Sequence, residues 1–455
     1  MKSSFAGRVY AESRSTERTP SVRLALAGLA LSVLLSSLGT SIANVALPSM
    51  AEAFNVSFQA VQWIVIAYLL AITTLIVSAG RLGDIVGRRR LLLIGISLFT
   101  LASFLCGMAP TLWLLIAARA LQGLGAAIML ALAMAFVGET VPKEKTGSAI
   151  GLLGTMSAIG TALGPTLGGA LIAGLGWRAI FFIKVPLGAL ALLLAYRYLR
   201  SDQREPKAES AGFDTIGTLL LALTLAAYAL AMTTARGSLG LLSMALLLLA
   251  IIGAGLFYFA EARTPSPLIR MAMFRKLELS ASLATSALVS TVMMATLVVG
   301  PFYLSRSLGL DAAMVGFVLS VGPAVAALTA VPAGRMTDRL GTPCVTTVGL
   351  LGMTAGAITL AVLPTTIGIP GFLAPIVVIT ASYAFFQTAN NTAVMADVSP
   401  DQRGAISGML NLSRNLGLIT GASAMGAVFA FGSASSDIAT APSDAVATGM
   451  RITFA

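Results

Sequence analysis

Long apolar stretches, separated by short polar turns, follow one another along nearly the whole chain. A helix needs about 20 apolar residues to cross the hydrocarbon core of a bilayer. Thirteen stretches meet this length, at residues 24–47, 58–79, 91–109, 112–137, 147–173, 179–198, 215–234, 239–260, 279–303, 313–333, 344–363, 371–396 and 404–432. A further apolar segment begins near Ala447, and we expect it to be the start of a fourteenth span that is cut off at Ala455. The pattern predicts an all-α integral membrane protein.

An internal repeat divides these spans into two related sets. The octapeptide GRLGDIVG at Gly80–Gly87 returns as GRMTDRLG at Gly334–Gly341, an offset of 334 − 80 = 254 residues. Further along, Gly160–Pro165 corresponds to Gly417–Ala422 at an offset of 257. Internal duplication of membrane helices is typical of secondary transporters. Because six spans with their turns need only about 200 residues, the excess predicts two inserted helices.

The repeat and the polar linkers predict six segments. We expect an N-terminal tail, a six-helix half, a linker, two inserted helices, a second linker, and a C-terminal half that holds helices nine to thirteen and the start of a fourteenth. In the same order, these are residues 1–23, 24–199, 200–214, 215–260, 261–278 and 279–455.

Composition and charge exclude several classes of protein. Only 10% of the residues are charged, against roughly 25% in soluble domains. With the N-terminus inside, 22 of the 29 Lys and Arg residues fall in the tail and inner turns, which predicts a multi-pass inner membrane protein with a cytoplasmic N-terminus. We therefore assign the net charge of +11 to topology and to anionic lipids at the cytoplasmic face, not to nucleic acid.

The sequence offers no candidate for metal or enzyme chemistry. It contains no histidine. Cys106 falls near the outer end of the third span and Cys344 at the inner end of the eleventh, so the two cysteines are expected on opposite sides of the bilayer. Neither a disulfide nor a metal site is therefore expected. No nucleophile and base pair stands out. We expect no cofactor and no enzymatic activity.

Five segments resemble motifs of the major facilitator superfamily, and more closely its 14-helix drug:proton antiporter branch (EmrB/QacA type). They are LGTSIANVALP (Leu38–Pro48), GRLGDIVGRRR (Gly80–Arg90), RALQGLGAA (Arg119–Ala127), GTALGPTLGG (Gly160–Gly169) and WRAIFFIKVPLG (Trp177–Gly188). The resemblance implies two six-helix halves with two linking helices, alternating access, and export driven by the proton gradient.

The repeated octapeptide has a plain and a functional interpretation. Glycines permit a tight turn, and the arginines set topology. The resemblance implies more, namely a pair of cytoplasmic latches that open and close between helices. The latch residues are Gly80, Arg81, Gly83, Asp84, Gly87 and Arg88 in the first copy, and Gly334, Arg335, Asp338, Arg339 and Gly341 in the second.

Two motifs inside the spans are candidates for coupling and packing. Arg119 lies several residues inside its span, where a charge is costly and functional by default; the resemblance implies a role in proton coupling, and neighbouring carbonyls offer a structural alternative. The antiporter motif comprises Gly160, Gly164, Pro165, Gly168 and Gly169. Small residues at this spacing also serve simply to pack helices.

By resemblance, four spans line a central cavity. Its candidate lining combines polar side chains with soft apolar ones, which suits amphipathic cargo. The candidates are Asn44, Gln122, Ser286, Ser290, Met293, Met294, Tyr383, Phe386, Gln387, Asn390 and Asn391. The alternative for any one of these amides is that it joins helices.

The charged residues inside the spans differ from those usual in the 14-helix branch. Gly39 stands where the branch usually has an aspartate, whereas Arg119, Lys184 and Arg414 place bases inside spans. With Arg119, Arg414 is a candidate for proton coupling or gating. Proton exchange could use Lys184, since a buried ammonium can lose its proton, or Asp84 and Glu139 near the inner face, and the remaining alternative is transport without proton coupling. Lys184 could instead extend its ammonium to the outer surface.

The sequence therefore predicts a proton-coupled exporter of hydrophobic or amphipathic small molecules. The basic cavity favours an alternative, a dedicated exporter of an anionic or neutral metabolite or lipid. We expect a monomer, and the sequence leaves open a periplasmic or outer-membrane partner.

Overall fold

Helices make up almost all of the part of the chain that the computed structural model describes. That part comprises residues 22–140, 146–199, 214–234, 240–264, 267, 276–362, 364–396, 403–433 and 441–455. The N-terminal helices are α1 (Val22–Val45), α2 (Leu47–Phe54), α3 (Phe58–Val86), α4 (Arg88–Met108), α5 (Leu112–Thr140), α6 (Thr146–Leu175), α7 (Ala179–Phe182) and α8 (Lys184–Tyr198).

The remaining helices form an inserted pair and a second half. The pair is α9 (Thr215–Thr234) and α10 (Leu241–Arg263). The second half contains α11 (Leu277–Phe302), the π-helical turn η3 (Tyr303–Ser307), α12 (Ala312–Leu340), α13 (Thr342–Val362), the short η4 (Thr365–Ile367), α14 (Ile369–Ala396), α15 (Arg403–Thr420), the π-helical η5 (Gly421–Met425), α16 (Gly426–Gly432) and α17 (Ser443–Phe454). Thirteen helical segments in the described ranges are long and apolar enough to cross a membrane, which confirms the predicted all-helical membrane fold.

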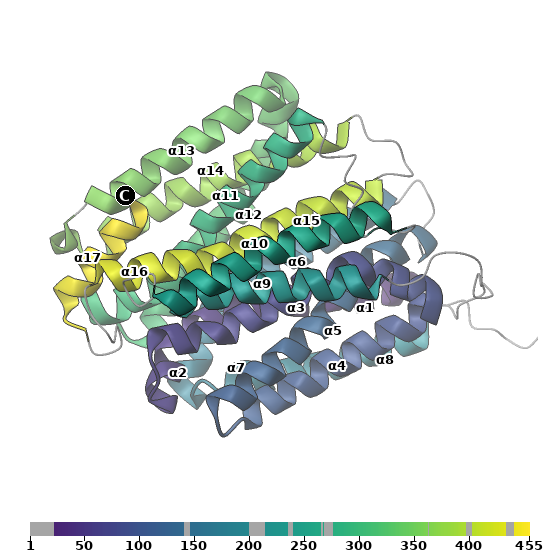
Figure 1. Cartoon of the computed structure of the whole chain (residues 1–455), viewed down its shortest axis with the longest axis horizontal. Coiled ribbons are helices and arrows are strands. Elements are labelled where there is room, and N and C mark those ends of the chain that lie inside the picture. The colour runs from purple at the N-terminus through teal and green to yellow at the C-terminus, as the bar shows by residue number, and fades with distance from the viewer. Residues whose placement is uncertain are drawn as a thin grey trace, which may run out of the picture.

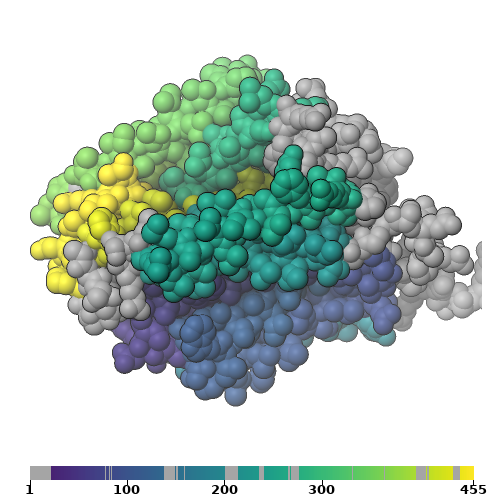
Figure 2. Space-filling view, in the orientation of Figure 1, coloured from purple at the N-terminus to yellow at the C-terminus, as the bar shows by residue number. Residues whose placement is uncertain are grey.

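One inserted helix, α9, lies against both halves of the molecule, and α10 packs on α9. Figure 1 shows α9 and α10 side by side between α1–α8 and α11–α16. Besides α10, α9 packs on α3 in the first half and on η5 in the second. In Figure 2 the teal pair covers the line along which the two halves meet on this face.

Equivalent turns end α3 and α12, and they show the duplication in the backbone. Gly87 and Gly341 have φ angles of 99° and 81°, values that favour glycine. The N–H of Gly87 donates to the carbonyl of Gly83 at 2.9 Å, and that of Gly341 to the carbonyl of Thr337 at 3.0 Å. We call the end of the bundle that carries these two turns the latch end, and the end that carries α2 and η3 the far end.

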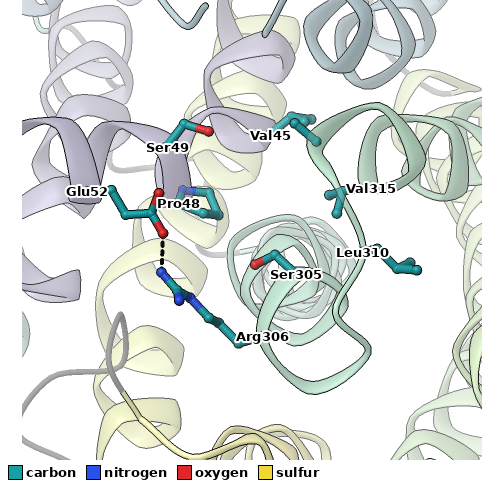
Figure 3. Close-up of a pocket in the computed structure, with 9 residues that line it drawn as sticks. Val45, Pro48, Ser49, Glu52, Ser305, Arg306, Leu310 and Val315 are labelled. Atoms are coloured by element: carbon teal, nitrogen blue, oxygen red, sulfur yellow. Dashed lines mark hydrogen bonds and ion pairs between the residues drawn. The ribbon is translucent and has the colours of Figure 1, made fainter. Parts of the chain in front are cut away.

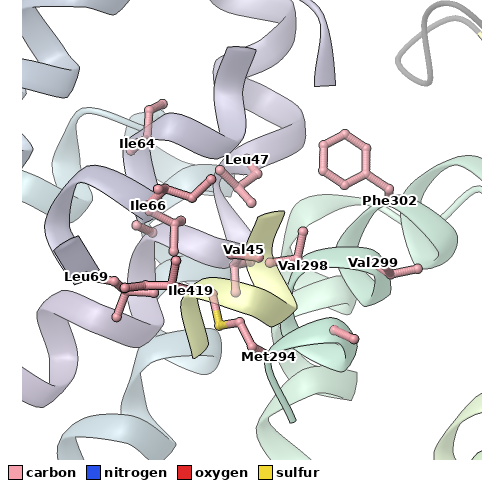
Figure 4. Close-up of a cluster of buried hydrophobic side chains, with 14 of the residues drawn as sticks. Val45, Leu47, Ile64, Ile66, Leu69, Met294, Val298, Val299, Phe302 and Ile419 are labelled. Atoms are coloured by element: carbon pink, nitrogen blue, oxygen red, sulfur yellow. The ribbon is translucent and has the colours of Figure 1, made fainter. Parts of the chain in front are cut away.

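A continuous apolar core joins the two halves. Val45 and Leu69 from α1 and α3 belong to the same buried cluster as Met294 and Val298 from α11 and Ile419 from α15, and Figure 4 shows these side chains together. At the far end, the ring of Phe58 meets those of Phe302 and Phe429 at centroid distances of 4.7 and 5.4 Å. The halves are therefore in close contact from the middle of the bundle to the far end.

Candidate functional site

Arg119 ties three helices of the first half together. It is fully buried, its Nε donates to the carbonyl of Ile64 at 2.9 Å, and its Nη1 donates to the carbonyl of Gly39 at 3.1 Å and to Oε1 of Gln122 at 2.6 Å. Gln122 in turn donates to the hydroxyl of Ser103 at 2.6 Å. The guanidinium thus holds α5 to α1 and α3, and Gln122 extends the network to α4.

Tyr68 fills the space beside Gly39. Its ring lies 4.1 Å from the guanidinium carbon of Arg119, and its hydroxyl donates to the carbonyl of Ser36 at 2.8 Å. A Cβ on Gly39 would come within 2.7 Å of the Tyr68 hydroxyl oxygen. An aspartate cannot occupy position 39 unless this tyrosine moves.

Lys184 is the second buried base of the first half. It begins α8, is fully buried, and its Nζ has no hydrogen-bond partner among the described residues. The Nζ lies 4.7 Å from the ring centroid of Phe181 and 6.0 Å from that of Phe99. The expectation that this side chain extends to the surface is wrong, because α7 and α4 cover it with aromatic rings.

A cavity of about 170 Å³ lies in the second half between α11, α14 and α15. Four candidate residues from three separate spans meet there, namely Ser286, Gln387, Asn391 and Arg414. Met395, Leu410 and Asn411 complete its lining. We call it the Arg414 cavity.

The other residues expected in a cavity lie elsewhere. Asn44 is buried and donates from Nδ2 to the carbonyl of Thr40 at 3.2 Å, while its Oδ1 has no partner in the described part of the chain. Asn390 donates to the carbonyl of Ser282 at 3.5 Å. Ser290, Met294 and Phe386 are buried in helix contacts, and Met293 and Tyr383 are half-buried against the core.

The glycines of the antiporter motif allow two close helix crossings. Gly160 and Gly164 face α1, where a Cβ would collide with the carbonyl oxygen of Leu34 and with Ser41. Gly169 faces the other half, since its Cβ would lie 2.9 Å from the Cα of Gly316 in α12. A Cβ on Gly168 would touch α1 at 3.0 Å, and Pro165 stands within α6.

The structure describes only some of the side chains of the latch motif. The side chains of Arg81 and Asp84 in the first copy, and that of the coupling candidate Glu139, lie outside the described part, so these three candidates are not placed. In the second copy Arg335, Asp338 and Arg339 are exposed. Gly80 and Gly334 have open space around them, Gly83 lies against α5, and Arg88 begins α4.

An ion pair that the sequence interpretation missed joins the halves at the far end. Glu52 of α2 accepts from Arg306 of η3 beside a cavity of about 230 Å³ (Figure 3). The pair occupies equivalent positions, since 306 − 52 = 254 is the offset of the repeated octapeptide. The shared offset can be read from the sequence. It indicates an ion pair only once the structure shows that the two halves face each other at these positions.

Two buried carboxylates meet where the inserted helices end. Asp214 accepts from the N–H of Gly217 at 2.7 Å and so caps α9. A Cβ on Gly217 would overlap carboxylate oxygens of both Asp214 and Glu261, and both acids are more than nine-tenths buried. No sequence pattern indicates that these two acids meet.

Comparison with known proteins identifies the family and the fold. The sequence pattern of the Major Facilitator Superfamily matches residues 29–422. The chain is 30% identical over 405 residues to the riboflavin transporter RibZ of Clostridioides difficile (strain 630), covering 88% of this chain and 87% of that protein. It is 31% identical over 424 residues to the multidrug resistance protein Stp of Mycobacterium tuberculosis (strain CDC 1551 / Oshkosh), covering 91% of this chain and 76% of that protein.

A solved structure shows the same fold. It is that of a bacterial homolog of the human lysosomal transporter Spinster in an inward-facing and unoccupied conformation. The TM-score is 0.67 at 16% identity, over 95% of this chain and 93% of that one.

Proposed function

The chain belongs to the major facilitator superfamily, and we propose that it exports hydrophobic or amphipathic small molecules by alternating access. It is a membrane transporter and not an enzyme. The observation that carries the proposal is the Arg414 cavity, where polar side chains from α14 and α15 share a wall with Met395 and Leu410. A polar and apolar lining of this kind suits amphipathic cargo, and the relative Stp is named a multidrug resistance protein.

The two ends of the bundle have the features of two gates. At the far end, aromatic rings and the Glu52–Arg306 pair join the halves. At the latch end, the two turns with glycine at positive φ end α3 and α12. Rocking of one half against the other would open these ends in turn. We place the latch end in the cytoplasm of a bacterial inner membrane, since the sequence assigns 22 of the 29 Lys and Arg residues to the tail and to the turns on the side of the two octapeptides.

The proton gradient is the proposed driving force. Lys184 is a candidate for proton exchange, because a charge buried among aromatic rings without an acceptor is costly in a membrane. Asp84 and Glu139 at the latch end are the alternative candidates. For Arg119 the coupling role remains a prediction. Its bonds to two backbone carbonyls support the structural alternative, in which it positions α1, α3 and α5.

A dedicated carrier of a neutral or anionic metabolite is the second candidate function. One observation favours it: among the described residues that line the Arg414 cavity, the one formal charge is positive. The relative RibZ, named a riboflavin transporter, is an example of a dedicated carrier in the same range of similarity.

The proposal is tested with inside-out membrane vesicles that contain the protein. An acidic lumen is imposed, and uptake of ethidium, a cation, is compared with uptake of dansyl-aminoundecanoic acid, an anionic amphiphile. We expect uptake of at least one probe that exceeds uptake by vesicles lacking the protein and that a protonophore abolishes.

The outcome separates the two candidates. Uptake of several unrelated amphiphiles supports the multidrug function, whereas uptake restricted to one metabolite class supports the dedicated carrier. Uptake that survives the protonophore contradicts proton coupling. If neither probe nor a wider set of amphiphiles enters above the empty vesicles, the export proposal fails.

A further inference from the structure

We propose that Arg414 anchors a carboxylate on the transported molecule, so that the Arg414 cavity selects amphiphiles that carry a carboxylate. This inference rests on the proposed transport function and specifies the chemical class of its cargo. The argument uses the depth, the unmet hydrogen bond and the surroundings of the Arg414 side chain.

The half-buried side chain of Arg414 belongs to a membrane-spanning helical segment. Arg414 stands eleven residues after the start of α15 at Arg403, which is about 16 Å along the axis at 1.5 Å per residue. Among the seven described residues that line the cavity, it carries the only formal charge. A lone positive charge at this depth is costly in a membrane unless an anion joins it.

The guanidinium also has a donor without an acceptor. The Nε of Arg414 is buried and has no hydrogen-bond partner in the described part of the chain. The Nε and Nη1 of Arg119 reach protein oxygens, although its Nη2 also has no partner among the described residues. Arg414 differs from Arg119 in that it lines a cavity. A planar guanidinium matches the two oxygens of a carboxylate with paired hydrogen bonds. The unmet Nε therefore suits an acceptor that enters from outside the protein.

The remaining walls suit the rest of a carboxylate amphiphile. The hydroxyl of Ser286 and the amides of Gln387 and Asn391 present hydrogen-bond donors around the same cavity. Met395 and Leu410 supply an apolar wall for an aliphatic chain. A cation would meet Arg414, and none of the described lining residues is a carboxylate that could offset the repulsion.

The test measures binding and does not depend on transport. The purified full-length protein is placed in nanodiscs of phosphatidylcholine, and binding of dansyl-aminoundecanoic acid is compared with binding of its methyl ester by dansyl fluorescence. The two probes share chain and fluorophore, and the ester replaces the anionic carboxylate with a neutral group that is one methyl larger. We expect the acid to bind about tenfold more tightly, as one charge-assisted pair allows.

Two variants of the cavity and one control carry the test. Arg414→Gln removes the charge, and Asn391→Asp keeps Arg414 while adding a competing carboxylate to the same lining at nearly constant size. Both are expected to lower affinity for the acid to that for the ester. Arg197→Gln removes an equal charge from an exposed position at the end of α8 and is expected to leave the preference intact.

Two outcomes would overturn the inference, and a third would separate it from the export proposal. If both cavity variants keep the preference for the acid, Arg414 does not anchor it. If adding phosphatidylglycerol to the nanodiscs abolishes the preference, the anion at Arg414 is a lipid headgroup and not cargo. If binding behaves as expected while vesicles transport neither probe, the export proposal fails and the carboxylate site stands.

Discussion

At the scale of the residue, two arginines inside membrane spans have different surroundings. Arg119 is fully buried and bonded to backbone oxygens of two other helices, whereas Arg414 borders a cavity with an unmet Nε. The sequence predicted a base inside a span in both cases. It could not separate them, because the acceptors of Arg119 are carbonyls, which every residue carries and no pattern marks.

The packing of Gly39 against Tyr68 gives a first prediction. Gly39→Ala places a methyl group 2.7 Å from the Tyr68 hydroxyl oxygen and 3.2 Å from its ring carbon Cζ. We expect the variant to lose about 1–3 kcal/mol of stability, as overpacked cores do. Tyr68→Phe removes the nearer atom, so the double variant is expected to recover part of that loss. Thermal unfolding of the detergent-purified protein measures both effects.

The recovery decides whether this contact is the cause. Tyr68→Phe alone loses the hydrogen bond to the Ser36 carbonyl and is expected to cost about 1 kcal/mol. A double variant as unstable as the sum of the single ones would contradict the assigned contact. It would also remove the steric explanation for why this chain has no aspartate at position 39.

At the scale of elements, α6 serves as a packing surface in two directions. Gly160 and Gly164 admit α1 of the same half, and Gly169 admits α12 of the other half. In the second half, Gly417 and Gly421 likewise face backbone carbonyls of α11. The stripe of small residues on α6 is therefore built for close helix contact, and its last glycine lies between the halves.

The two directions predict different sensitivities to a single methyl group. Gly169→Ala puts its Cβ 2.7 Å from the carbonyl oxygen of Ala312, a backbone atom that cannot rotate away. We expect a loss of about 1–3 kcal/mol together with slower transport, because α6 and α12 must separate. Gly154→Ala, on the same helix, meets no atom within 4 Å and should be neutral or gain up to about 1 kcal/mol from helix propensity.

This pair of variants is measured by thermal unfolding and by vesicle uptake in parallel. The contrast between the two sites carries the test, since both change glycine to alanine within α6. Equal effects at both positions would show that alanine acts through the helix itself and not through the crossing.

The elements themselves were predictable where their signals are local. Apolar length gave the spans, and the repeated glycine pattern gave the turns at Gly87 and Gly341, whose positive φ angles the structure shows. Contacts between distant segments were not predictable. The described lining residues of the Arg414 cavity include Ser286, Gln387 and Asn391, while Asn390, also predicted to line a cavity, donates to the carbonyl of Ser282. The rotation of each helix is set by packing, which the apolar pattern alone does not fix.

At the scale of the whole molecule, the duplication places equivalent positions face to face. Glu52 and Arg306 are related by the same offset of 254 residues as the two octapeptides, yet they carry opposite charges and pair across the far end. Two identical halves could not form this bond, since like charges would meet. Divergence at one pair of positions therefore adds an attraction between the halves at the far end.

The last prediction concerns the balance between the two open forms. The side chains of Arg306 and Glu52 are 32% and 61% exposed, so their attraction amounts to about 0.2–1 kcal/mol. Neutralising either residue, in Glu52→Gln or Arg306→Gln, should raise the share of molecules open at the far end by up to about fivefold. A cysteine introduced at Ser49, which lines the far-end cavity, reports this opening after Cys106 and Cys344 are replaced. The measured quantity is its rate of labelling by a membrane-impermeant maleimide in whole cells.

A charge exchange and a control identify the cause. The double variant Glu52→Arg with Arg306→Glu should return the labelling rate to that of the parent. Arg178→Gln removes an equal charge from a side chain that stacks on Trp177 and should leave the labelling rate unchanged. Faster labelling in the exchanged pair than in the parent would show that the far end is held by its aromatic contacts and not by this ion pair.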